Sequence, residues 1–534
     1  MECTHKVTDN NKDDDPFVKD ELIIGRFNTH SSSTNGKIKT KNGKELKLYI
    51  VKPLDPSLPP FQVPYGGKST GDLIIKFRFN KWINNIPEGL IGDDGEVFEA
   101  TEENLERILL NYYNIYPKKS RKLYNNINPL EDTIDRKNYS YINLSDKSIQ
   151  PLIFSIDPEN CEDIDDALSI YKYDNITVVG VHIAQPVYWL TQDDLDEKLK
   201  TQCSTYYGKN RIDLFGSKLT LEASLKKGYR RPAYSTSFIF KSTELIDTIH
   251  EPTFITNNEN YSYDNVIERP EYLLLKEFTD SLIKGDIEDV VSYWMVKTNA
   301  SIGKLFNDKV PKISIPYRVN TIPLVDDRIV NDELEIQKVF NNRNLEKAEY
   351  KLQVSDEEMI HSALGLVNYC HFTSPIRRIV DSYIHYYLTY GNLTNSIIDV
   401  NHLNTLSENT KKFHRQLDYK RSIETNFTDN EMETDIWIYD IIDLNKVEVY
   451  IEKLGVFKKI NIYHPKFSYC INETIPQMNN EDICKINMLV SNKEILVPYE
   501  FKVGDCIKMK LYKRDDIMPN RMILPFYLIN LLDL

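Results

Sequence analysis

The stretch SIDPENCEDIDDALSI, residues 155–170, is the strongest local signal in the sequence, because six acidic side chains fall within ten of its residues between apolar flanks. The flanks predict that this acidic segment is held against a hydrophobic core. Carboxylates this close repel one another and raise each other's pKa values unless a cation lies among them. The candidate metal ligands are its four aspartates, Asp157, Asp163, Asp165 and Asp166.

Three interpretations of this stretch stay open on its residues alone. Mg²⁺ favours hard oxygen ligands, and two metal ions roughly 3.5–4 Å apart can activate a water and stabilise the leaving oxygen of a phosphodiester. An acidic surface loop is the structural alternative. A calcium loop of the EF-hand type is disfavoured, because residues 157–168 contain no glycine.

Length and composition indicate a globular protein of several modules. The chain has 534 residues, of which 41% are hydrophobic, and this predicts three to five domains. It has no apolar run of roughly 18 residues, so we expect no membrane association. The polar, acidic start does not resemble a secretory signal. The seven scattered cysteines predict reduced thiols and a cytoplasmic protein, with the nucleus as the alternative compartment.

The net charge of −14 is unusual for a protein that binds phosphates, but one segment is basic. Between Cys203 and Lys241 there are eight Lys or Arg residues and two acidic ones. A basic lining for a nucleic-acid channel and an ordinary solvated face both remain open as interpretations.

Periodicity predicts an α+β protein. Short runs separated by Gly, Pro and Asn predict small β-barrels before residue 130 and again after about residue 433. Strands predominate in residues 153–243, and the apolar spacing then predicts helices.

Two motifs resemble the ribonuclease II/ribonuclease R family, also called the RNB family. The first is DPENCEDIDDALS at 157–169, and the second is YCHFTSPIRR at 369–378, followed by Asp381 and His385. They lie about 200 residues apart in the family's order, and weaker likeness extends over residues 153–426. Residues 71–95 resemble the second cold-shock-type barrel of the family's eukaryotic branch, which includes the exosome's catalytic subunit.

The resemblance implies an RNB catalytic domain flanked by small OB-type β-barrels. The composition of the first residues predicts a disordered tail at 1–20. The domain limits expected beyond it are a degenerate cold-shock-like barrel at 21–65, a second one at 66–135, the RNB domain at 145–430 and a C-terminal OB-like RNA-binding barrel at 435–534.

The resemblance also implies roles for single residues. The four aspartates would hold two Mg²⁺ ions, with Mn²⁺ as the alternative, and Asp165 and Asp166 would be critical to cleavage. Arg377 would contact the scissile phosphate, supported by Arg378. Tyr206 would stack on the 3′-terminal base, and Tyr207 takes that role if the alignment slips by one residue.

Local physics agrees with a phosphate site near the arginines. Ser374 can cap a helix and Pro375 suits its first position, so the sequence predicts a helix that starts here. A helix N-terminus favours phosphate through its free N–H groups.

His182 and His371 are interpreted as structural, because neither has a metal-ligand spacing.

The function implied is a processive 3′-to-5′ hydrolytic exoribonuclease that acts on single-stranded RNA and releases nucleoside 5′-monophosphates. The alternative is a family member that has lost catalysis and regulates RNA by binding it. Retention of all four aspartates favours the enzyme. With no endonuclease and tether region before the barrels, we expect a monomeric, free-standing enzyme without exosome association. Departures from the family pattern fall on supporting positions, such as Gln185, Ser362 and Ile379.

Overall fold

The computed structural model describes residues 22–115 with short gaps, 140–141, 151–308 without 200–203 and 208–209, 315–320, short pieces within 336–352, 359–461 without 392–397, 429–430 and 444–445, and short pieces within 488–529. Contacts divide the chain into two compact units, one of which is Pro117–Lys411 and the other Met1–Tyr116 with Lys412–Leu534. The predicted tail at 1–20 lies outside the described residues. No helix in the described part of the chain is long and apolar enough to cross a membrane.

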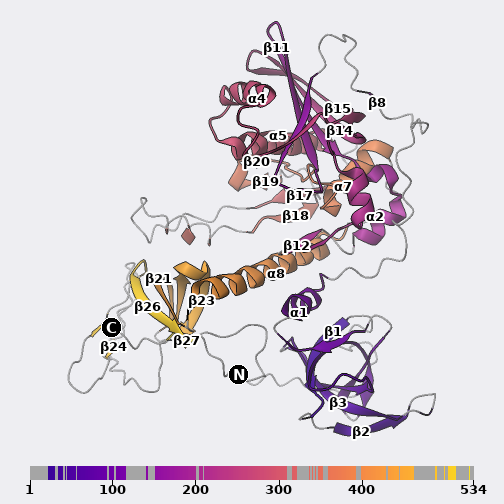
Figure 1. The fold of residues 1–534 in the computed structure, drawn as a ribbon, viewed down its shortest axis with the longest axis vertical. Helices are drawn as coiled ribbons and strands as arrows, with labels where there is room; N and C mark the ends of the chain where they lie inside the picture. The colour runs from indigo at the N-terminus through magenta and orange to yellow at the C-terminus, as the bar shows by residue number, and fades with distance from the viewer. Residues whose placement is uncertain are drawn as a thin grey trace. The chain divides into compact units, whose positions relative to one another are not determined.

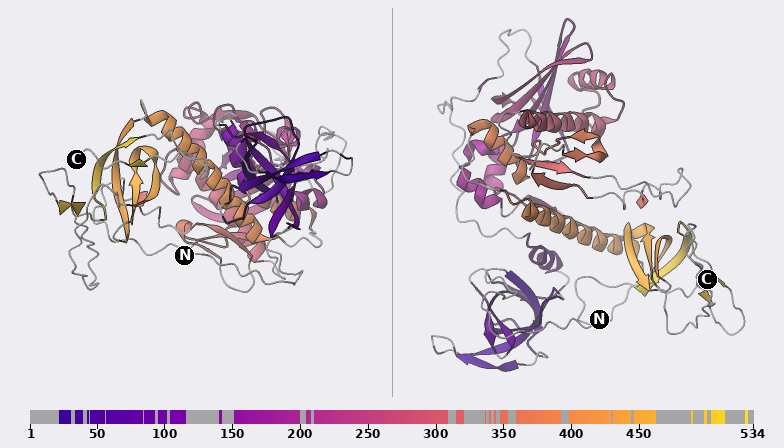
Figure 2. Two further views of the ribbon diagram at one scale, coloured as in Figure 1. Left: turned by 90° about the horizontal axis from the view of Figure 1, so that it is seen from below. Right: turned by 180° about the vertical axis from the view of Figure 1, so that it is seen from behind.

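The N-terminal strands form one closed barrel, seen in both views of Figure 2. The first strand pairs antiparallel with the third and the fifth, and the fourth pairs parallel with the sixth, which closes the order β1-β3-β4-β6-β5. This is the topology of a five-stranded OB-type barrel. Its elements are β1 (Leu22–Asn28), β2 (Thr34–Lys39), β3 (Glu45–Pro53), β4 (Phe61–Tyr65), β5 (Asp72–Ile83), β6 (Ile86–Leu90), β7 (Val97–Glu99) and α1 (Leu105–Tyr112).

This barrel corrects the predicted division into two barrels at residue 65. The boundary falls inside a single sheet, since Ile23 is paired with Phe77 across it and both side chains belong to one core cluster. Alternating strands show which faces are buried but not which strands pair, so the local pattern alone could not assign 22–65 and 72–99 to one domain.

The central unit is built on a seven-stranded sheet in the order β16-β9-β10-β11-β14-β15-β8. Its middle strands are long and antiparallel, and most of them lie within residues 153–243, where the sequence predicts that strands predominate. The strands are β8 (Ser140–Tyr141), β9 (Ile153–Asp157), β10 (Asp166–Tyr173), β11 (Ile176–Ala184), β14 (Arg230–Lys241), β15 (Glu244–Thr256) and β16 (Glu259–Ser262).

Helices α4 (Pro270–Asp280) and α5 (Ile287–Asn307) lie along one face of this sheet (Figures 1 and 2). Trp294 of α5 is fully buried, packs against Phe238 and Phe240, and donates its indole N–H to Thr279 Oγ1 at 3.0 Å. A buried indole needs such a partner for its N–H group. Both helices follow the strand-rich segment 153–243, as the apolar spacing predicts.

The remaining elements of this unit are short and surround the ends of the sheet. They are α2 (Gln192–Lys198), β12 (Thr205–Tyr207), β13 (Asn210–Ile212), α3 (Ser217–Ala223), β17 (Pro316–Val319), β18 (Glu349–Leu352), β19 (Ile360–His361), β20 (Leu366–Val367) and α7 (Ile379–Tyr390). The long helix α8 (Val400–Asn426) follows.

The C-terminal strands form an antiparallel five-stranded sheet in the order β23-β22-β21-β26-β27. It begins at 431, slightly before the predicted limit of 435. Its closure into a barrel stays a prediction, because most of 462–527 lies outside the described residues. The strands are β21 (Glu431–Asp443), β22 (Lys446–Ile451), β23 (Val456–Asn461), β26 (Cys506–Tyr512) and β27 (Leu528–Ile529), beside the separate pair β24 (Met488–Leu489) and β25 (Pro498–Tyr499).

A buried polar chain ties the central strands together. His182 of β11 is 1% exposed and hydrogen-bonds Ser169 Oγ at 3.0 Å and Ser235 Oγ at 2.7 Å, and Ser235 reaches Thr253 Oγ1 at 2.7 Å. Burial lowers the pKa of His182 to about 4. The imidazole is therefore neutral in the folded protein and links neighbouring strands. This agrees with the interpretation of His182 as a structural residue.

We expect this histidine to make stability depend on pH. Between pH 6.5 and 4 the unfolded state binds a proton at His182 that the folded state excludes, so stability falls as the pH falls through this window. Urea unfolding should show that His182→Gln reduces the loss of stability between pH 7.5 and 5.0 by about 2 kcal/mol. The exposed His30→Gln serves as control, and an unchanged slope in His182→Gln would contradict the assignment.

Candidate metal-dependent active site

The four aspartates meet at one end of two neighbouring strands. Asp157 is the last residue of β9 and Asp166 the first of β10, and these strands pair antiparallel. The connecting loop therefore returns Asp163 and Asp165 to the same end of the sheet. The loop is fixed at Ile164, whose N–H donates to Ser224 Oγ at 3.0 Å and whose carbonyl accepts from Leu225 N at 3.0 Å.

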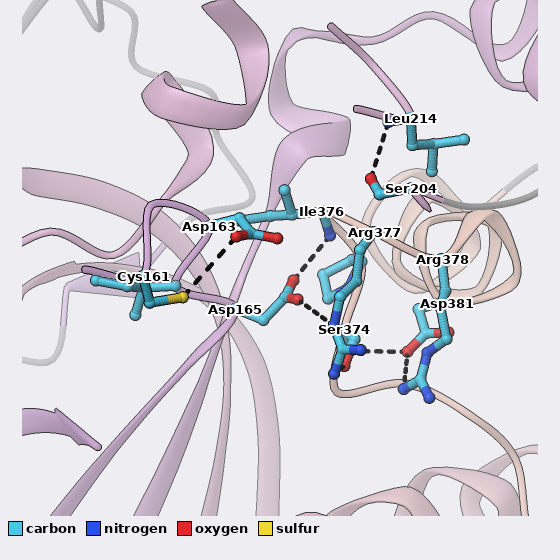
Figure 3. Close-up of polar contacts among 12 residues, drawn as sticks. Cys161, Asp163, Asp165, Ser204, Leu214, Ser374, Ile376, Arg377, Arg378 and Asp381 are labelled. Atoms are coloured by element: carbon cyan, nitrogen blue, oxygen red, sulfur yellow. Dashed lines mark hydrogen bonds and ion pairs between the residues drawn. The ribbon is translucent and has the colours of Figure 1, made fainter. Parts of the chain in front are cut away.

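Asp165 joins the two sequence motifs. Its carboxylate is 4% exposed and accepts from Ile376 N at 2.8 Å and from Arg377 Nε at 3.2 Å, which lie 211 and 212 residues further along the chain (Figure 3). Burial raises the pKa of Asp165 to about 7, against the opposing effect of the Arg377 guanidinium. The aspartate cluster and the arginine turn are thus parts of one site.

Asp157 and Asp166 have the environment of carboxylates that need a cation. Burial raises the pKa of Asp157 to about 6 and that of Asp166 well above its ordinary value, and neighbouring aspartates raise both further. The Oδ2 atom of Asp157 is buried without a hydrogen-bond partner. A hard divalent cation such as Mg²⁺ fits this set of oxygen atoms and would offset the repulsion.

Asp163 is held by other side chains in this structure. The Tyr206 hydroxyl and Arg211 Nη1 both donate to its carboxylate, the latter at 3.3 Å, and the free thiol of Cys161 lies 3.8 Å from it. Within the described residues, no three His, Cys, Asp or Glu side chains are arranged closely enough to hold a metal ion. The residues therefore supply the donors for a metal, and Asp163 and Asp165 are engaged by neighbouring protein groups.

Arg211 is a member of the site that sequence reasoning missed. Its guanidinium contacts Asp163, Glu162 at 3.0 Å and Asp213 at 2.5 Å. In the sequence it counted as one of the eight basic residues between Cys203 and Lys241 and as part of the segment that follows Tyr206, without a role at the site. The signal that could have identified Arg211 is the acidic motif that it contacts, which includes Asp163, 48 residues earlier in the chain.

Tyr206 lies beside the aspartates. It is in β12, is 38% exposed, and donates its hydroxyl to Asp163, so the ring borders the aspartates while part of it faces solvent. Hydrogen bonding to Asp163 and burial raise its pKa, with burial the larger cause. Tyr207 follows in the same strand and is half-buried.

The predicted helix start at Ser374 is wrong. Residues 375–377 form a turn, in which Arg378 N donates to Ser374 O at 2.9 Å, and α7 begins at Ile379. The N–H of Ser374 is taken by Asp381 Oδ1 at 2.8 Å, while that of Ile376 is taken by Asp165. The backbone N–H groups near the arginines therefore bind carboxylates rather than forming a free helix N-terminus.

The two arginines have different surroundings (Figure 3). The side chain of Arg377 is 48% exposed, contacts Asp165, and donates from Nη2 to Ser374 Oγ at 3.0 Å. Arg378 turns away to pair with the fully buried Asp381 at 2.8 Å. Arg377 is thus available to a ligand beside the aspartates, whereas Arg378 supports the turn.

The other histidine singled out in the sequence is also structural. His371 is hydrogen-bonded through Nδ1 to the Tyr350 hydroxyl at 2.8 Å, and burial holds its pKa well below the ordinary value. Its ring therefore helps to hold the second motif in place.

Comparison with known proteins identifies this arrangement. Residues 142–271 and 279–390 match the model of the RNB domain. Ribonuclease R of Chlamydia pneumoniae is 25% identical over 327 residues, which cover 47% of this chain and 48% of that protein. The chain thus matches about half the length of this curated relative.

Solved structures share the fold. Ribonuclease R of Mycoplasma genitalium in complex with ribose-methylated single-stranded RNA has a TM-score of 0.67 at 15% identity, over 92% of this chain and 87% of that one. Yeast Ssd1, described as a pseudonuclease, has a TM-score of 0.61 at 13% identity, over 83% of this chain and 65% of that one. The unit that carries the aspartates and the arginine turn matches the RNB domain, and it has the α+β fold of these solved structures.

Proposed function

We propose that this chain is a metal-dependent exoribonuclease, which shortens single-stranded RNA from its 3′ end and releases nucleoside 5′-monophosphates. The contact of Asp165 with Ile376 and Arg377 carries the proposal, because it brings the guanidinium group of Arg377, which is chemically suited to a phosphate, beside the aspartates. Support comes also from the RNB match and from the fold shared with a ribonuclease R bound to RNA.

Each residue then has a defined task. Bound divalent metal would supply an activated water and stabilise charge on the leaving oxygen. Asp157 and Asp166 hold it with the other two aspartates. Arg377 fixes the scissile phosphate, and the exposed ring of Tyr206 stacks on the last base, an interaction that tolerates any sequence.

The direct test uses a 5′-labelled poly(A) strand, with Mg²⁺ and separately with chelator. A ladder that descends to a few nucleotides only with metal supports the enzyme, and a circular RNA of the same sequence should resist. Uncut RNA that is tightly bound under all conditions would overturn the proposal.

That second outcome would favour the alternative, an RNA-binding regulator. The specific observation behind it is that Asp163 and Asp165 are occupied by Tyr206, Arg211 and Arg377 in a fold shared with a pseudonuclease. Retention of all four aspartates favours the enzyme over this alternative.

Stacking by Tyr206 makes a further prediction. Tyr206→Ala should raise KM for poly(A) about tenfold, because stacking on an aromatic ring contributes roughly 1–3 kcal/mol per base. Tyr206→Phe keeps the ring and should retain KM, although it loses the hydrogen bond to Asp163. Steady-state kinetics on both variants checks this, and an equal loss in both would assign Tyr206 to holding Asp163 instead.

A further inference from the structure

A hollow lies beside the aspartates on the side away from the arginines. It has a volume of about 490 Å³ and is bounded by residues 157–161, Lys226, Lys227, Tyr229 and 260–262 among others. This is within the range of roughly 300–1,000 Å³ typical of small-molecule sites. Figure 3 shows Cys161, which lines the hollow, on the opposite side of Asp163 and Asp165 from Arg377 and Arg378.

The basic wall of the hollow is fixed to the aspartate loop. Leu225, which precedes the two lysines, donates its N–H to Ile164 O at 3.0 Å, and its carbonyl accepts from Asn257 Nδ2 at 2.7 Å. Lys227 is tied to the opposite wall, with N–H to Asn260 Oδ1 at 2.6 Å and Nζ to Glu259 Oε2 at 2.7 Å. The backbone that carries Lys226 therefore has a set position next to the cluster.

Lys226 is the cation available to a ligand here. No carboxylate in the described residues forms an ion pair with the ammonium group of Lys226. The ammonium group of Lys227, in contrast, is paired with Glu259. An ammonium group in a small hollow is a donor suited to a phosphate.

Tyr229 supplies an aromatic surface at the same place. Its side chain is 57% exposed, and the Arg231 guanidinium covers one ring face at 4.9 Å from the centroid. The other face is available for stacking, which any nucleobase can provide. The hollow thus combines an ammonium group that can donate hydrogen bonds to a phosphate with an aromatic ring that can stack on a base. This pair of groups matches a ligand with one phosphate and one base.

We propose that this hollow binds a nucleoside 5′-monophosphate. This ligand is the product of the reaction proposed above, so the assignment of the hollow rests on that proposed function. Lys226 binds the phosphate and Tyr229 stacks on the base. The released nucleotide is the one whose base stacks on Tyr206, so a site beyond Asp157 receives it after cleavage while the shortened strand stays bound. This arrangement suits processive removal of nucleotides.

The test measures binding of 5′-AMP and of adenosine to the full chain by calorimetry with Mg²⁺ present. Lys226→Ala should weaken 5′-AMP about tenfold, the effect of one charge-assisted hydrogen bond, and leave adenosine unchanged. Lys226→Arg should restore most of the 5′-AMP affinity. Tyr229→Ala should weaken both ligands several-fold, and Tyr229→Phe neither. The exposed Lys241→Ala, at the far end of β14, is the matched control.

Equal 5′-AMP affinity in the unmutated protein and Lys226→Ala would overturn the proposal. So would a loss of affinity for a poly(A) strand, measured in chelator, without any loss for 5′-AMP, because the hollow would then belong to the path of the RNA. If no RNA is shortened but 5′-AMP binding still depends on Lys226, the hydrolysis proposal fails and the nucleotide site stands.

Discussion

Asp166→Asn should abolish shortening of single-stranded RNA while the protein stays folded. Asn keeps the shape of the side chain and removes the charge that would hold a metal ion at the start of β10. Loss of several kcal/mol of charge stabilisation in the transition state corresponds to a factor of about ten in rate for each 1.4 kcal/mol. We therefore expect the rate on 5′-labelled poly(A) to fall by about a thousandfold or more.

The same variant should be more stable than the unmutated protein in chelator. Asp166 is raised in pKa by burial and by Asp157 and Asp165, so its ionised form costs folding free energy at neutral pH. The sign follows from linkage: a carboxylate with a raised folded pKa favours folding at low pH, and that advantage is lost as the pH rises through the folded pKa. A neutral Asn avoids this cost, and urea unfolding at pH 7.5 measures the gain.

Mg²⁺ provides the complementary measurement. A cation that binds only the folded protein raises its melting temperature, and Asp166→Asn should lose most of that rise. Asp174→Asn is the matched control, since Asp174 is exposed in the β10–β11 turn at φ 54°, a conformation that Asn adopts readily. Full activity in Asp166→Asn, or a full Mg²⁺ response, would remove this aspartate from the proposed metal site.

The sequence predicted the parts of the site that depend on local pattern. The aspartate stretch, its flanking strands and the helices α4 and α5 follow from side-chain spacing and are found where the pattern places them, whereas α2 and α3 were not predicted. The start of α7 was not predictable in this way. Ser374 and Pro375 are a good local helix start, but Asp381 and Asp165 take the N–H groups that such a helix would leave free.

Long-range pairing explains the other differences. The N-terminal barrel is closed by pairing between β1 and β5, about fifty residues apart, and no local signal specifies that pair. The contact of Arg211 with Asp163 likewise joins residues that only the folded sheet brings together. Sequence periodicity identifies elements and faces, whereas tertiary partners decide which polar groups are already engaged.

The largest expected effect on stability belongs to Arg378, a residue that the family resemblance places in RNA binding. Its guanidinium pairs with Asp381, which is 0% exposed and also accepts the Ser374 N–H. Arg378→Ala leaves this carboxylate buried without its cation, and breaking such a buried pair costs about 3–5 kcal/mol. Urea unfolding should show this loss.

A second substitution separates the structural role from RNA contact. Replacing both partners, as in Arg378→Met with Asp381→Leu, removes the unpaired charge and should recover much of the stability, because an apolar pair of similar volume can replace a buried ion pair. Arg377→Ala is the matched control: its half-exposed side chain should cost little stability but should slow RNA cleavage strongly. If Arg378→Ala instead unfolds at the same urea concentration as the unmutated protein and binds RNA more weakly, the charge of Arg378 serves the RNA, and the turn at 375–377 is held by Asp165 and Asp381 without it.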